Sequence, residues 1–181
     1  MGEVTNIVTE KLDPTSGLYV SMALFRNVKN SKVIKDKVVS GALQCSIIKP
    51  SLIAHPFQVV VAANKAAASQ VFGSMVTKSI YTELLFNLSI SKNISQSLMK
   101  FGINESDQDI LVATIHAEDA SNMSEIMVQV EGQVVPLTDL QNICDFNLLR
   151  KSYKISEDEL KVTSLLDSIV SRIATSDFVS H

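Results

Sequence analysis

Residues 55–73 read HPFQVVVAANKAAASQVFG, and the architecture follows from this stretch. Pro56 suits the first position of a helix and Gly73 suits the end of one, so we expect a helix over residues 57–72. His55 lies at the N-cap position. The polar residues of this helix share one narrow stripe at about 100° per residue: Gln58, Lys65 and Ser69. The remainder is mostly Val and Ala, which predicts a helix packed on nearly every side.

Short apolar segments before and after this helix predict the strands of a sheet. Residues 18–27 alternate with the period of two that is typical of a strand, and both faces are partly apolar. Residues 44–48 form a second apolar run, and residues 110–116 are rich in β-branched side chains. A fourth segment, residues 134–137, is expected to form a short strand.

Four further segments indicate helices. We expect a polar helix over residues 30–40, two amphipathic helices over residues 79–88 and 94–101, and another from residue 123 to about 130. Glycines follow three of these segments, and Asn93 is placed to cap the start of the third.

The last long helix is the most clearly marked. Ser156 and Glu159 form a capping-box pattern at its expected start, and it should run to about Thr175. Its apolar residues cover roughly half of its circumference, whereas a helix resting on its own core needs only about 100°. They are Val162, Leu165, Leu166, Ile169, Val170, Ile173 and Ala174. This surplus of apolar surface predicts contact with a partner.

The chain has 181 residues, near the common size of one domain, and it contains no repeat, low-complexity tract or long linker. We therefore expect a single domain over residues 1–181. The expected fold class is α+β, with a small, mostly antiparallel sheet packed against several helices. These include the buried central helix of residues 57–72 and the long C-terminal helix.

Charge and hydropathy limit the partners and the cellular compartments that the sequence allows. Its net charge is −3, so no overall positive field draws it to nucleic acid, and any RNA contact needs a local cluster. The longest stretch without Asp, Glu, Lys or Arg, residues 50–64, is shorter than the roughly 20 apolar residues that span a bilayer. No signal-peptide pattern is present, and Asn6 stands where a myristoylation motif at Gly2 needs Ser or Thr. We expect a soluble protein of the cytoplasm and nucleus, without membrane contact.

No familiar catalytic, cofactor or metal-binding motif is present. The patterns GxxxxGK[ST], GxGxxG, GxSxG and HExxH are all absent. His55, His116 and His181 are widely scattered. Cys45 and Cys144 are the only cysteines, and we interpret them as reduced, buried thiols, with a disulfide or a metal role as the alternative. We therefore expect no catalytic residue, no cofactor and no metal site.

Several segments resemble one family in their order, spacing and length. They are HPFQ at residues 55–58 with VAANKA at 61–66, TELLFNLS at 82–89, NIS at 93–95, KFGI at 100–103, YKIS at 153–156, LLD at 165–167 and RI at 172–173. With weaker matches from about Leu18 to Asp177, the chain resembles the TPRKB family, the PRPK-binding subunits of the KEOPS (EKC) complex. One departure is His55, where vertebrate members are expected to carry Asp. Because Asp is the better N-cap, this departure bears on helix stability and not on function. Residues 117–124 match poorly and are expected to form a variable loop.

The resemblance implies a non-catalytic role. The KEOPS complex installs threonylcarbamoyl on the adenosine beside the anticodon of tRNAs that read codons beginning with adenine. Its TPRKB-like subunit binds the small atypical kinase/ATPase PRPK and modulates the complex, and archaeal relatives help to capture the 3′ CCA end of the tRNA. The implied partners are a PRPK-type kinase, the other KEOPS subunits through it, and tRNA.

The apolar C-terminal helix is the candidate kinase-binding surface. We expect part of its apolar set to pack inward and the remainder to meet the partner, since a large exposed apolar patch usually marks an interface. The alternative is that the whole set belongs to the core. The candidate residues are Leu165, Leu166, Ile169, Val170 and Ile173.

A local basic cluster is the candidate RNA surface, because single-stranded ends are held by backbone charge and by stacking. The candidate residues are Lys65, Lys78, Lys92, Asn93 and Lys100, with Asn64 as a polar neighbour and Phe72 or Tyr81 as a stacking ring. The alternatives are plain solvated lysines and, for Asn64, a side chain that satisfies a buried backbone group.

A second class of function stays open. A small-molecule-binding or enzymatic α/β domain with an unrecognised pocket would also lack familiar motifs. Turnover or a bound cofactor in the purified chain would favour that class, whereas a stable complex with co-expressed PRPK would favour the kinase-binding subunit.

Overall fold

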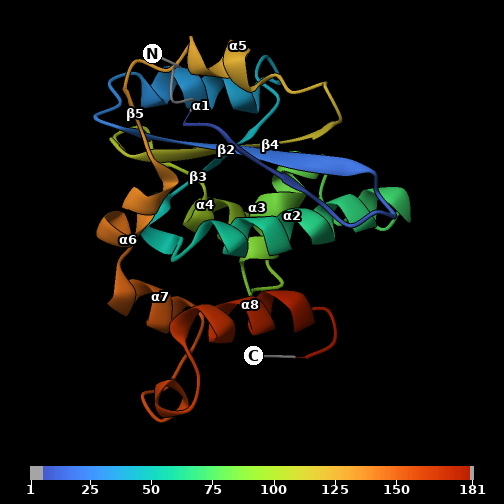
Figure 1. Cartoon of the computed structure of the whole chain (residues 1–181), viewed down its shortest axis with the longest axis vertical. Helices are drawn as coiled ribbons and strands as arrows, with labels where there is room; N and C mark the ends of the chain where they lie inside the picture. Colours follow the sequence, from blue (N-terminus) through green and yellow to red (C-terminus); the bar gives the residue numbers. More distant parts are fainter. Residues whose placement is uncertain (1–5, 180–181) are drawn as a thin grey trace.

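The computed structural model describes residues 6–179, which form a five-stranded antiparallel sheet with helices on both faces (Figure 1). The strands are β1 (Val8–Lys11), β2 (Leu18–Arg26), β3 (Ser46–Ile48), β4 (Ile110–Ala117) and β5 (Gln133–Val135). Their order is β1-β2-β4-β3, and β5 pairs with the end of β2 that β1 leaves free. The α+β class and the antiparallel sheet are confirmed. The predictions for Gly2 and His181 lie outside the described residues.

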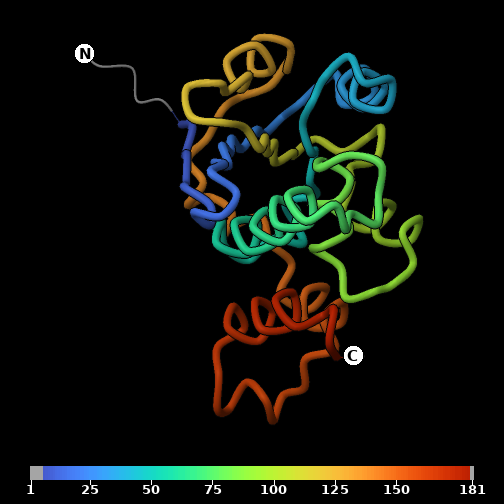
Figure 2. Tube along the Cα trace, turned by 90° about the vertical axis from the view of Figure 1, so that its right-hand side faces the viewer, coloured from blue at the N-terminus to red at the C-terminus, as the bar shows by residue number. Residues whose placement is uncertain are grey.

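The sheet separates two apolar cores, because alternate residues of each strand point to opposite faces. In β2, Val20, Met22 and Leu24 lie in the larger core, whereas Ala23 and Phe25 lie in the smaller one. Figures 1 and 2 show the layers that result. The smaller core is covered by α1 (Ser31–Val39) and α5 (Met123–Met127), and the larger one by α2 (Pro56–Val71), α3 (Ile80–Leu88) and α4 (Ile94–Phe101). A further layer outside α2 holds α7 (Phe146–Ser152) and α8 (Leu165–Thr175).

Helix α2 lies at the centre of the larger core, as its composition predicts. Six of its residues are buried: Gln58, Val59, Ala62, Ala63, Ala66 and Ala67. His55 Nδ1 accepts a hydrogen bond of 3.0 Å from the N–H of Phe57 and so caps the start of the helix. Gly73, with φ of 64°, follows its end in the left-handed conformation that glycine adopts most easily. Both predicted boundaries are confirmed.

The predicted helices around α2 are confirmed as well, with one shorter than expected. Ser79 and Thr82 form a capping box at the start of α3. At the start of α4, Asn93 Oδ1 accepts a hydrogen bond of 2.9 Å from the N–H of Gln96. Helix α5 ends before the expected residue 130, because the chain turns there towards β5, although Val130 is still buried.

Some elements of the structure were not predicted. Strand β1 is exposed along its whole length, so its sequence lacks the apolar alternation of a half-buried strand. The others are α7, α6 (Leu140–Ile143) and the 3₁₀ turns η1 (Pro50–Leu52), η2 (Leu137–Asp139) and η3 (Glu159–Lys161). Each is shorter than the window of about 11 residues in which helical periodicity becomes recognisable.

The C-terminal helix starts later than its capping-box pattern predicts, so the predicted start was wrong. Ser156 Oγ does accept a hydrogen bond of 3.1 Å from the N–H of Glu159, but only the short turn η3 follows. The Glu159 carboxylate also binds Arg172, and the chain leaves the turn before a full helix forms. Ser164 caps the true start of α8. Val162 therefore lies outside the helix and is 86% exposed.

The two cysteines are free thiols, Cys45 buried and Cys144 half-buried. Burial raises the pKa of the Cys45 thiol to about 12, so this thiol is protonated at neutral pH. Within residues 6–179, no helix combines the length and the apolar character needed to cross a bilayer.

Candidate partner and RNA surfaces

Helix α8 is fastened to α2 through its buried side. Ile169 and Ile173 are fully buried in the core that α2 also lines. Lys65 of α2 donates hydrogen bonds to the carbonyl oxygen of Ile173 at 2.8 Å and to the hydroxyl of Ser176 at 2.7 Å. Its ammonium group also lies 3.1 Å from the carboxylate of Asp177. The Ile173 carbonyl oxygen thus accepts from Lys65 and from the Ser176 hydroxyl, and the positive charge lies at the C-terminus of α8, so Lys65 caps this end of the helix.

An ion pair fastens the segment before α8 to one flank of the helix. Two nitrogens of Arg172 donate to the two carboxylate oxygens of Glu159, at 2.6 and 2.7 Å. Arg172 also donates to the carbonyl oxygen of Lys154 at 3.2 Å. The hydrogen bonds from Arg172 are the main reason why the pKa of the Glu159 carboxyl is lowered to about 2. The loop of residues 156–164 is thereby tied to the helix that it precedes.

The opposite flank of α8 carries apolar side chains that the described residues cover only in part. Leu166 and Val170 are half-buried, lie one turn apart and, by the helical period, point away from the Arg172 side. Leu165 is also half-buried, but it packs against the larger core. We call the surface of Leu166 and Val170 the α8 flank. It is an apolar surface on a helix that is held at its end and at its side.

A pocket of about 430 Å³ lies where α4 and α7 meet the loop after α3. Its lining includes four lysines: Lys92, Lys100, Lys151 and Lys154. The pKa of Lys100 is lowered, first by partial burial and then by the positive charge of Lys151. Lys92 also donates a hydrogen bond to the carbonyl oxygen of Ser176, just after α8. We call this site the lysine pocket; its concentrated positive charge favours an anionic ligand.

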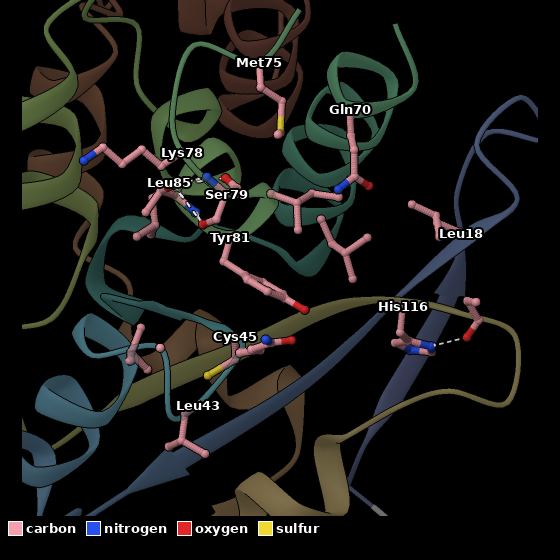
Figure 3. Close-up of a pocket in the computed structure, with 17 residues that line it drawn as sticks. Leu18, Leu43, Cys45, Gln70, Met75, Lys78, Ser79, Tyr81, Leu85 and His116 are labelled. Carbon is pink, nitrogen blue, oxygen red and sulfur yellow. Dashed lines mark hydrogen bonds between the residues drawn. The ribbon is translucent and has the colours of Figure 1, made fainter. Parts of the chain in front are cut away.

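A larger pocket, of about 550 Å³, lies beside the end of β4 and is called the β4 pocket below. Figure 3 shows the Tyr81 ring extending into it, between Cys45 and His116. Its walls are mainly apolar and include Leu18, Leu43, Met75, Leu85 and Ile115. Lys78 lies at its rim, with an exposed side chain.

Comparison with known proteins assigns the chain to a family. The sequence model of the family described as kinase binding protein CGI-121 matches residues 25–177, which include every α-helix from α1 to α8. The chain belongs to the CGI-121 family.

Two relatives of this CGI-121 protein match it over nearly all of their own length. The EKC/KEOPS complex subunit TPRKB of Danio rerio is 34% identical over 171 residues, which cover 94% of this chain and 98% of the relative. The EKC/KEOPS complex subunit cgi121 of Aspergillus fumigatus is 30% identical over 178 residues, covering 88% of this chain and 93% of the relative. The resemblance to the TPRKB family is confirmed.

The candidate partner residues of this CGI-121 protein divide between core and surface. Ile169 and Ile173 lie in the core, so a charged side chain at either position would disrupt folding and could not report on binding. Leu165 lies between core and surface. Leu166 and Val170 are the two that remain available to a partner.

The candidate RNA residues lie at three separate places. Lys92 and Lys100 line the lysine pocket, and Asn93 caps α4 beside it. Lys65 is committed to the C-terminus of α8, and Lys78 lies at the β4 pocket. The basic patch therefore forms around the lysine pocket, without Lys65 or Lys78.

The polar and aromatic neighbours expected at the RNA site lie elsewhere. Asn64 Oδ1 accepts a hydrogen bond of 2.8 Å from the backbone N–H of Asp13, so it holds the turn between β1 and β2. Phe72 is 72% exposed at the end of α2, and Tyr81 lines the β4 pocket. Neither ring lines the lysine pocket.

Lys151 and Lys154 complete the lysine pocket but were not among the candidate residues. They follow Arg150, so three basic residues occur within five positions at the end of α7. Such a local cluster of basic residues in the sequence is a signal for an anion-binding surface. It was missed because α7 itself was not predicted, so nothing placed these residues beside α4.

The two histidines within residues 6–179 have structural partners. His55 caps α2, and His116 Nε2 lies 2.7 Å from Ser21 Oγ while its ring stacks on Tyr19. Across residues 6–179, no group of three or more His, Cys, Asp or Glu side chains is arranged to hold a metal ion.

Proposed function

We propose that the chain is a non-catalytic subunit of a KEOPS/EKC complex that binds a PRPK-type kinase/ATPase and, through it, the other subunits. Two findings support the proposal: the family is described as kinase-binding, and the relatives are named as EKC/KEOPS subunits. The structural observation that carries it is the α8 flank, where Leu166 and Val170 stay partly exposed beside two fully buried isoleucines. In this role the chain works in the cytoplasm and nucleus.

The α8 flank has the physical properties of a binding anchor. Leu166 and Val170 are already largely buried, so completing their burial adds a fraction of the roughly 1.5–3 kcal/mol that full burial of such a side chain contributes. Lys65 and Arg172 already hold the helix in place, so little conformational entropy is lost when a partner docks. A few apolar anchors of this kind usually supply most of the affinity of an interface.

We propose the lysine pocket as the surface that meets tRNA within the assembled complex. Lys92, Lys100 and Lys151 can neutralise backbone phosphates, and the release of counterions then drives binding. The rest of the chain is net negative, so the attraction is local. By helping to hold the tRNA 3′ end there, the subunit modulates the formation of threonylcarbamoyladenosine.

A small-molecule-binding or enzymatic domain is the second candidate, and the β4 pocket is what favours it. Its volume lies within the range of about 300–1,000 Å³ that is usual for ligand sites. Its chemistry favours binding over catalysis, because burial raises the pKa of the Cys45 thiol to about 12 and suppresses the reactive thiolate.

Co-expression decides between the two candidates. The chain carries an affinity tag, a PRPK-type kinase is co-expressed without one, and the purified material is analysed by size-exclusion chromatography. We expect both proteins in one stoichiometric peak, and we expect the chain alone to show neither ATP turnover nor a bound cofactor. Separate elution of the two proteins, or turnover by the chain alone, would overturn the proposal.

A further inference from the structure

The β4 pocket lies where β4 extends beyond its neighbour β3. The last pair between these strands is Ser46 with Ala113, whereas β4 continues to Ala117 and stays paired with β2 on its other side. The chain before β3 does not continue the strand. It bends towards α1, where the N–H of Leu43 donates to the carbonyl oxygen of Lys37 at 3.0 Å. Within the described residues, the end of β4 therefore has a strand on one edge only.

The direction of the free backbone groups follows from the ladder. The N–H of Leu12 donates to the carbonyl oxygen of Leu18 at 2.9 Å, so Leu18 and every second residue of β2 point their polar groups towards β1. The residues between them, such as Tyr19 and Ser21, point their N–H and C=O groups towards β4. Tyr19 pairs with His116 in this way, and Ser21 pairs with Thr114. The remaining residues at the end of β4, Ile115 and Ala117, consequently direct their N–H groups towards the β4 pocket.

Ile115 makes this edge unusual, because it is only 5% exposed. A buried backbone N–H or C=O without a partner costs free energy, so native proteins almost always pair such groups. Among the bonds of the described residues, the backbone groups of Ile115 that face the pocket take part in none. The carbonyl oxygen of Ala117 accepts a hydrogen bond of 3.2 Å from the N–H of Ala120. The N–H of Ala117 takes part in no bond among the described residues, so it is a second free donor at this edge.

We propose that this edge of β4 binds an extended peptide segment of a partner protein as an added strand, in line with β3. An extended backbone supplies alternating acceptors and donors, and these are the hydrogen-bond partners that the backbone groups of Ile115 and Ala117 lack. Strand addition to a free edge is a general mode of peptide recognition. The unpaired edge, residues 114–117, accommodates roughly four residues of a strand.

The lining of the pocket defines the chemistry of the peptide. Leu18, Met75 and Leu85 can receive an apolar side chain that points to one face of the sheet, and Leu43 lies on the other wall. Among the lining residues that the structure describes, only Lys78 carries a full charge, and its exposed side chain lies at the rim (Figure 3). The segment that fits is therefore apolar where it crosses the pocket and acidic where it leaves it.

This site is separate from the kinase surface proposed above. The residues that line the β4 pocket come from β2, β4, α1, α2, α3 and the connections between them, and none belongs to α7 or α8. Loss of peptide binding and loss of kinase binding are accordingly expected from different substitutions.

A pair of substitutions at one exposed position tests the proposal. Ala117→Pro removes the free N–H without touching the ladder with β2, and proline is tolerated where an edge N–H faces outward. Ala117→Ser keeps the N–H and serves as the matched control. A phage-displayed library of random heptapeptides is selected on the protein, and the enriched peptides are measured by fluorescence polarisation against both variants.

We expect enriched peptides to bind the protein and Ala117→Ser equally and Ala117→Pro about tenfold more weakly, the effect of one lost hydrogen bond. We also expect an enriched peptide to slow hydrogen exchange at the amides of Ile115 and Ala117 in the unaltered protein, a readout that does not depend on a variant. Failure to enrich any peptide, equal binding to all three proteins, or unchanged exchange at both amides would each overturn the proposal.

Discussion

The Nζ atom of Lys65 donates a hydrogen bond of 2.8 Å to the carbonyl oxygen of Ile173, and this contact joins the central helix α2 to the end of α8. The two residues are far apart in sequence, yet together they set how α8 lies on the core. The same contact explains why Lys65, which is charged and lies on a polar stripe, is not a free basic residue. Its positive charge is used on the helix terminus.

Replacing Lys65 should therefore weaken the fold. Lys65→Met keeps the length of the side chain but removes the donor, and we expect the free energy of unfolding to fall by about 1–2 kcal/mol, as for the loss of hydrogen bonds from a charged group. Urea denaturation followed by circular dichroism measures it. Lys78→Met, at an exposed position, is the control and should change stability by less than about 0.5 kcal/mol. Equal stability of the two variants would show that Lys65 does not fasten α8.

The buried hydroxyl of Tyr153 joins three segments. It donates to the carbonyl oxygen of Leu88 at 2.5 Å and accepts from Gln58 Nε2 at 2.9 Å, and burial raises its pKa above the ordinary value. Tyr153→Phe removes one hydrogen bond from each partner, although Gln58 still donates to Leu52, so we expect a loss of about 1–3 kcal/mol in the same denaturation experiment. The half-exposed Tyr19 offers a control, since Tyr19→Phe should be nearly neutral. A neutral Tyr153→Phe would mean that this network adds nothing to stability.

The ion pair between Glu159 and Arg172 makes stability depend on pH. The pKa of Glu159 is about 2 in the folded protein, below its ordinary value of 4.5, so its stabilising contribution is complete above about pH 5. That contribution is lost as the pH falls from 4.5 towards 2. We expect the free energy of unfolding of the unaltered protein to be about 1 kcal/mol higher than that of the Glu159→Gln variant at pH 7. This difference should shrink below pH 4.5. A difference that is constant between pH 7 and pH 3 would contradict the assignment.

The lysine pocket should supply the salt-dependent part of RNA binding. In the assembled complex, Lys100→Glu combined with Lys151→Glu should weaken binding of a single-stranded RNA that ends in CCA. The slope of log affinity against log salt concentration should fall by about 0.7 for each phosphate that is no longer neutralised. Filter binding across a salt series measures both quantities. Lys29→Glu combined with Lys35→Glu makes the same charge change just before α1 and within it, and should leave the slope unaltered; an equally reduced slope in this control would point to net charge alone.

The central helix could be predicted because its boundaries depend on neighbouring residues. His55 and Gly73 act on the backbone within a few positions, and their effects are the same in any fold. The start of α8 could not be predicted in this way. Ser156 and Ser164 both accept a hydrogen bond in the way an N-cap does, and the sequence around each is compatible with a helix start. Only Ser164 is followed by a long helix, which packs Ile169 and Ile173 into the core, and this packing is a property of the folded chain.

The candidate partner and RNA surfaces could be predicted only in part, because the contacts between helices also depend on the folded chain. The apolar excess of α8 is visible in its sequence, but which residues face the core depends on how α2 lies against it. A polar stripe on a helix can face either water or the carbonyl groups of another helix, and the sequence does not distinguish the two. In the structure, Lys65 donates to a carbonyl group of α8. Strand β1 carried no signal, because all four of its residues are exposed.

The role of the α8 flank can be measured by isothermal titration calorimetry of a purified PRPK-type kinase against variants of this helix. Leu166→Glu and Val170→Glu each place a charge on the apolar flank, and Ser171→Glu places the same charge at an exposed position of the same helix. We predict that each of the first two variants keeps the circular dichroism spectrum of the protein but binds the kinase more than about tenfold more weakly. Ser171→Glu should bind normally. Undiminished binding by both Leu166→Glu and Val170→Glu would contradict the claim that the α8 flank is the kinase-binding surface.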